Sequence, residues 1–127
     1  MSATSDISLQ LAGVPETLLI TLYARAAESQ KSDAILQDEK AIEIAQRLDY
    51  DFAKFEPGWS SQLGCVIRAW HIDMLVQTFI DTHPEAIIVN LGAGLCTRYL
   101  RLETAQVRWY DIDFPEVIEL RRQLFEG

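Results

Sequence analysis

Two short segments of the chain decide its fold: AIIVNLGAG at residues 86–94 and WYDID at residues 109–113. The first is a run of branched apolar residues that ends in glycines, and the second is a short apolar segment that ends in acid. In α/β proteins, a glycine turn after one strand lets a ligand approach the backbone, and an acid at the end of the next strand binds ribose hydroxyls. The two segments therefore predict an α/β unit with a nucleotide-type binding site.

Hydrophobic periodicity predicts the elements on either side of the glycine turn. Helical spacing indicates a helix that opens at Pro15 and is broken by residues 29–32, a second helix over residues 40–55 and a third over residues 60–82. The first strand is expected at residues 87–91, and its lack of polar alternation is typical of a strand with both faces covered. The remaining elements are a short helix at residues 97–102, a strand at residues 107–112 and a helix at residues 115–125.

These elements divide the chain into three expected parts. Residues 1–14 are predicted to be a flexible polar tail, residues 15–84 a helical cap region, and residues 85–127 an incomplete α/β unit. A chain of 127 residues fits one domain with a modest core.

Composition limits the partners that the chain can have. It is 49% hydrophobic and 24% charged with a net charge of -8, which is typical of a globular protein and unfavourable for contact with nucleic acid or an anionic membrane. No basic segment precedes an apolar run near the start, so we expect no secretory signal there. No apolar run approaches the roughly 20 residues that span a bilayer, so we expect no transmembrane helix. Two cysteines without metal-type spacing are expected to be reduced thiols. We therefore expect a cytoplasmic protein.

The glycine turn is a weak signal when taken alone. Gly92 and Gly94 flank Ala93, so the backbone can turn tightly and leave room for a ligand. A dinucleotide-binding turn has a third small residue three places further on, but this chain has the larger Thr97 there. No Gly-Lys-Ser/Thr follows, which excludes a P-loop. A plain strand-to-helix turn remains an alternative.

An acid at the expected distance strengthens the binding hypothesis. Asp113 follows Gly94 by 19 residues at the end of the second strand, where a ribose-binding carboxylate is expected. The alternative is a helix cap, because Asp113 and Glu116 have capping-box spacing. The two roles are compatible, since a carboxylate has several acceptor sites. For Asp111, one step deeper in the strand, a structural role is favoured.

Arg68 is the third candidate. Its neighbours at helical spacing are Gly64, Ile72, Leu75 and Phe79, which form an otherwise apolar ridge. A buried guanidinium there needs an anion. The anion is either an acidic side chain of the protein or a ligand carboxylate held in a bidentate fork, and snorkelling to solvent is a further alternative.

Taken together, VNLGAGLCTR at residues 89–98 and WYDIDFPEVI at residues 109–118 closely resemble the leucine carboxyl methyltransferase family. That family includes bacterial O-methyltransferases of the tetracenomycin polyketide type. The Arg68 helix and the segment of residues 17–38 are also similar to the N-terminal region of the family. The resemblance covers most of the chain. Many members have Asp in place of Cys96 and are about twice as long as this chain.

The resemblance implies a fold, a cofactor and roles for five residues. The fold would be an N-terminal helical region followed by the first two β-α units of a class I, Rossmann-like methyltransferase sheet. The cofactor would be S-adenosylmethionine. Arg68 would bind its methionine carboxylate, the turn of Gly92, Ala93 and Gly94 would lie against it, and Asp113 would hold its ribose hydroxyls. The methyl acceptor would be a small molecule or a protein carboxylate. Neither a catalytic acid or base nor a metal ligand is nominated.

Two other functions compete with methyl transfer. One is a nicotinamide-dependent oxidoreductase, against which Thr97 counts. The other is a non-catalytic remnant or interaction module, because a unit of two parallel strands leaves apolar faces and edges that favour self-association. Tyr23 and Arg25 are further candidates for the edge of a site.

Overall fold

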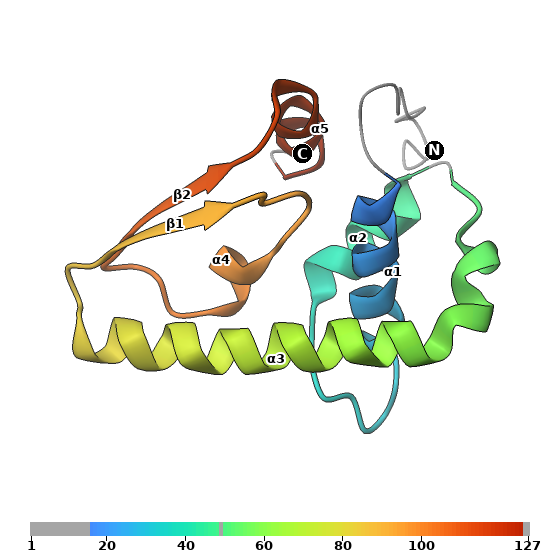
Figure 1. Ribbon diagram of the computed structural model, residues 1–127, viewed down its shortest axis with the longest axis horizontal. Helices are drawn as coiled ribbons and strands as arrows, with labels where there is room; N and C mark the ends of the chain where they lie inside the picture. The colour runs from blue at the N-terminus through green and yellow to red at the C-terminus, as the bar shows by residue number, and fades with distance from the viewer. Residues whose placement is uncertain (1–15, 49, 126–127) are drawn as a thin grey trace. The chain divides into compact units, whose positions relative to one another are not determined.

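The computed structural model describes residues 16–48 and 50–125, so the predicted tail at residues 1–14 lies outside the described part (Figure 1). The chain forms two compact units, of which the first ends at Arg68 and the second begins at Ala69. This border falls within the long helix α3 (Trp59–Thr82), which has the expected length. The three-part division expected from the sequence stays a prediction.

The first unit is helical. It contains α1 (Thr17–Ser29), α2 (Glu39–Arg47) and the 3-10 helix η2 (Phe52–Gly58), and α1 packs against α2. The buried apolar residues of these helices and the segments next to them are Leu19, Leu22, Ala24, Ala26, Leu36, Ala41, Ile44 and Leu48.

The predicted helix over residues 40–55 is interrupted. It ends at Arg47, because Leu48 is extended. A second, 3-10 helix then begins after Asp51, whose carboxylate accepts a hydrogen bond from the Ala53 N–H. Such local side-chain bonds compete with continued α-helix.

Buried polar contacts connect α1 with the start of α2. Asp38 caps α2 by accepting a hydrogen bond from the Ala41 N–H at 3.0 Å, and the same side chain forms an ion pair with Arg25 at 2.8 Å. Ser29 accepts a hydrogen bond from the Asp38 N–H at 2.7 Å. Arg25 is therefore a buried residue with a structural partner, and the expectation that it edges a binding site stays a prediction. Tyr23 stacks on Phe52, with ring centroids 5.8 Å apart.

The second unit contains a small parallel sheet. Strand β1 (Ile87–Leu91) lies beside β2 (Arg108–Ile112), with α4 (Arg98–Arg101) between them in sequence and α5 (Pro115–Phe125) after them (Figure 1). The register pairs Val89 with Tyr110 and Leu91 with Ile112. The strands and α5 have nearly the predicted bounds. This mixed helix and strand arrangement is compatible with part of a methyltransferase fold.

One face of this sheet is open. The side chains of Val89 and Leu91 are 50% and 75% exposed, and their partners Tyr110 and Ile112 are also exposed. The expectation that both faces of β1 are covered is therefore wrong for the described residues. A strand with a continuous run of apolar residues is buried on both faces only where other elements cover both faces of its sheet. The described residues leave the face with Val89 and Leu91 uncovered.

The long helix differs from the expectation that no segment of the chain is long and apolar enough to span a bilayer. Among the described residues, the helical segment Phe52–Thr82 is long and apolar enough to cross a bilayer by length and composition alone. A single such helix is weak evidence, because core helices of soluble proteins meet the same criteria. This one carries Asp73, whose carboxylate accepts hydrogen bonds from Arg98 at 2.7 Å and Arg101 at 2.9 Å.

Candidate binding site at the glycine turn

The turn after β1 has a backbone that favours glycine. Gly92 has φ 64° and Gly94 has φ 49°, both in the left-handed region that most side chains avoid. A Cβ added at Gly92 would meet no atom within 4 Å, so the space beside this residue is open. Ala93 between them is buried, and its N–H donates to the carbonyl of Ile112 at 3.0 Å. The turn is thereby fastened to the end of β2.

Asp113 lies directly against this turn. Its Oδ2 accepts a hydrogen bond from the Gly94 N–H at 2.8 Å, and its Oδ1 accepts one from the Phe114 N–H at 2.7 Å. The carboxylate is half-buried and has about four acceptor positions, so further hydroxyl donors can bind it. Gly94 and Asp113, selected by their spacing in the sequence, are thus brought into contact.

The capping-box alternative for Asp113 is not what the structure shows. The first hydrogen bonds of α5 run from the N–H groups of Val117 and Ile118 to the carbonyl of Phe114, which makes Phe114 the N-cap residue. Asp113 lies one residue before the cap, and its carboxylate accepts from Gly94 and Phe114.

A polar network lies behind the turn. Asp111 Oδ1 accepts hydrogen bonds from Asn90 Nδ2 and Trp109 Nε1, both at 3.0 Å. Its Oδ2 accepts one from Arg121 Nη2 at 2.9 Å, and Arg121 Nη1 donates to the Gly94 carbonyl at 3.0 Å. These contacts give Asp111 the structural role that the sequence favoured.

Arg121 was missed by the sequence reasoning, although a signal was present. It lies four residues after Val117 and three before Leu124, which are both buried. A basic residue in the buried stripe of a helix indicates a polar partner within the protein.

Arg68 lies in the first unit, whereas the turn and Asp113 belong to the second. Its side chain is exposed and makes no hydrogen bond or ion pair with any residue in the described ranges. Leu75 and Phe79 on the same ridge are 57% and 47% exposed. The guanidinium of Arg68 is therefore not buried among the described residues, which agrees with the solvent alternative, and the binding role of Arg68 stays a prediction.

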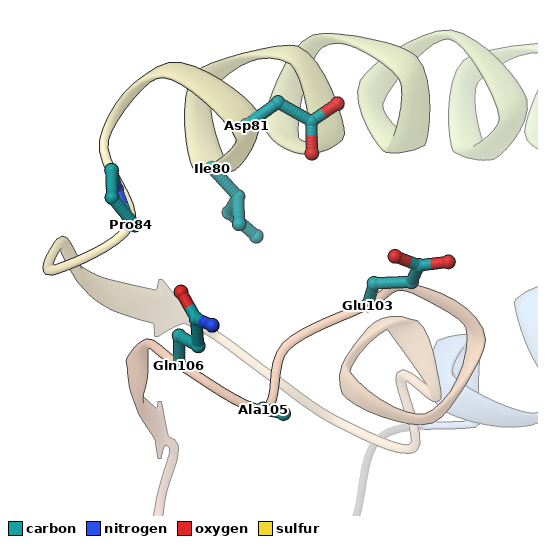
Figure 2. A pocket seen from close by; sticks show the side chains of 6 residues that line it. All are labelled: Ile80, Asp81, Pro84, Glu103, Ala105 and Gln106. Atoms are coloured by element: carbon teal, nitrogen blue, oxygen red, sulfur yellow. The ribbon is translucent and has the colours of Figure 1, made fainter.

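A separate hollow of about 270 Å³ opens beside the end of α3. Figure 2 shows Asp81 and Ile80 projecting from the end of α3 on one side of it and Glu103 on another side. None of the predicted site residues lines this hollow. Within residues 16–48 and 50–125, no group of three or more His, Cys, Asp or Glu side chains could hold a metal ion.

Comparison with known proteins decides the family. The leucine carboxyl methyltransferase family matches residues 18–127. The chain belongs to that family. It is similar to the tetracenomycin polyketide synthesis O-methyltransferase TcmP of Streptomyces glaucescens, with 37% identity over 119 residues that cover 93% of this chain and 44% of the relative. It is also similar to the S-adenosyl-L-methionine-dependent methyltransferase dpfgK of Gibberella zeae, with 33% identity over 91% of this chain and 42% of the relative.

Family membership confirms the resemblance seen in the glycine and acid motifs. The chain spans less than half the length of these two relatives. The match includes both strands, the turn between β1 and α4, and α5.

Proposed function

We propose that this chain carries the glycine turn and ribose-binding acid of an S-adenosylmethionine-dependent O-methyltransferase. The observation that carries the proposal is the contact between Asp113 and the Gly94 N–H at 2.8 Å. It places an acid with unused acceptor positions beside a turn whose Gly92 opens onto free space. The family and the names of both relatives support the same chemistry.

Each proposed contact follows from the chemistry of the residue. Asp113 would accept hydrogen bonds from the two ribose hydroxyls, since a carboxylate is an acceptor at neutral pH. The backbone of residues 92–94 would lie against the cofactor, because no side chain beyond the Ala93 methyl stands in the turn. Arg68 would pair with the methionine carboxylate. The turn needs no third glycine, because S-adenosylmethionine has no pyrophosphate.

The reaction class places few demands on catalytic side chains. When bound, the cofactor supplies a methyl group activated by its sulfonium. A carboxylate acceptor is already ionised at neutral pH and needs no general base. The protein therefore acts by aligning the acceptor oxygen with the methyl group. We propose a small molecule or a protein carboxylate as acceptor, a cytoplasmic location, and a pocket for the acceptor that needs sequence beyond these 127 residues.

Calorimetric titration of the chain with S-adenosylhomocysteine tests the proposal. Asp113→Asn should weaken binding by about tenfold or more, because hydrogen bonds to a charged group contribute about 1.5–3 kcal/mol. Glu116→Gln is the matched control, since it neutralises an exposed acid three residues away and should leave the affinity unchanged.

A titration with NADH separates the nicotinamide alternative. The fully buried Thr97 occupies the position where a dinucleotide turn has a small residue, so NADH should not bind. Binding of NADH without binding of S-adenosylhomocysteine would overturn the proposed function.

A further inference from the structure

We propose that Arg121 is a positioning residue that fixes the Gly94 peptide for cofactor binding. This inference rests on the proposed function. The guanidinium joins two groups that belong to different parts of the site, since Nη1 donates to the Gly94 carbonyl at 3.0 Å and Nη2 donates to Asp111 at 2.9 Å. Its side chain is 12% exposed and that of Asp111 is 20% exposed, so water screens the pair only partly.

The Gly94 residue is held at both of its backbone polar groups. Its N–H donates to Asp113 Oδ2 at 2.8 Å, and its carbonyl accepts from Arg121. Glycine has more backbone freedom than any other residue, and its positive φ here is only one of several accessible conformations. Two fixed hydrogen bonds select one of them. Asp113 thereby fixes the peptide group before the Gly94 Cα and Arg121 fixes the one after it, so together they define the conformation of Gly94.

The surrounding residues keep the guanidinium in place. Asn90 and Trp109 both donate to Oδ1 of Asp111, which leaves Oδ2 for Arg121. The ring of Phe125 lies under the guanidinium, 4.2 Å from its central carbon. A planar fork with several donors can bond both acceptors and stack on this ring together, whereas an ammonium group cannot.

The test compares Arg121→Met with Arg122→Met in the full chain. The two substitutions remove the same charge from adjacent positions of α5, but Arg122 is exposed and makes no bond to a described residue. Two measurements are made on each variant: the nuclear magnetic resonance signals of the Gly94 amide and the Trp109 indole N–H without ligand, and the dissociation constant of S-adenosylhomocysteine.

Arg121→Met should shift both signals, speed hydrogen exchange at the Gly94 amide, and weaken binding by about tenfold. Arg121→Lys should recover only part of the affinity, and Arg122→Met should change nothing. If Arg121→Met leaves the Gly94 signal and the affinity equal to those of Arg122→Met, the positioning role is overturned. If Arg121→Met does not fold, Asp111→Asn, which weakens the hold on the guanidinium, must show the same changes, and their absence also overturns the role.

The outcome separates this inference from the proposed function. Absence of S-adenosylhomocysteine binding by the unsubstituted chain would contradict the function, whereas Gly94 and Trp109 signals that Arg121→Met leaves unchanged would by themselves contradict the positioning role without any ligand.

Discussion

Gly92 and Gly94 are the residues on which the backbone conformation of the site depends most directly. Both have positive φ, and the open space at Gly92 means that strain, rather than a clash, would oppose a side chain there. The glycines and Asp113 could be predicted from the sequence because turn chemistry and spacing are local properties. The Asp111 and Arg121 network was not predicted, because the partner of a half-buried arginine depends on tertiary contacts that no spacing rule supplies.

Gly92→Ala should lower the free energy of unfolding by about 1–2 kcal/mol, the cost of a left-handed conformation for an L-residue. The matched control is Gly64→Ala in α3, where φ is not positive and a new Cβ meets nothing within 4 Å. That control should stabilise the chain by up to about 1 kcal/mol, because alanine favours helix over glycine. Urea denaturation of both variants measures the two effects. Equal effects at the two positions would contradict the backbone argument.

At the level of helices and strands, hydrophobic periodicity predicted most elements. The long helix, both strands and α5 agree closely with their expected bounds because each has a clear start or stop signal, such as Pro115 at the first position of α5. The helix expected over residues 40–55 was too long, since the period alone does not show the extended Leu48 or the capping by Asp51. The exposure of one face of the β1–β2 sheet could not be predicted either, because the apolar sequence of a strand does not specify which elements cover that strand.

Asp38→Ala should be among the most destabilising substitutions in the first unit. It removes both the cap of α2 and the carboxylate that pairs with buried Arg25, and loss of one partner of a buried pair costs about 3–5 kcal/mol. Thermal unfolding followed by circular dichroism measures the loss. Asp33→Ala removes an exposed acid in the same unit and should change stability by less than about 0.5 kcal/mol. A similar loss in both variants would contradict the assigned role of Asp38.

Considered as a whole, the chain joins a helical unit to a sheet with an open apolar face. Two parallel strands with free edges are marginal as an isolated sheet. Hydrogen bonds, rather than burial, therefore hold the residues of the glycine turn and Asp113 in place. The role of Arg68 at this site remains a prediction.

The open face predicts that the chain associates with itself as concentration rises. Light scattering should show a mass that increases with concentration, and Val89→Lys together with Tyr110→Lys should reduce this increase, because both residues lie on the open face. Glu119→Lys with Gln123→Lys adds lysines to exposed positions of α5 and serves as the control. A monomeric mass at all concentrations would contradict the prediction.

The most direct test maps the binding of S-adenosylhomocysteine onto the backbone amides of the chain by nuclear magnetic resonance. We predict saturable changes centred on the amides of Gly92, Gly94 and Asp113, with a further change at Arg68 if its guanidinium pairs with the amino-acid end of the ligand. Saturable binding that leaves the glycine turn and Asp113 unperturbed, or no binding at all, would contradict the account.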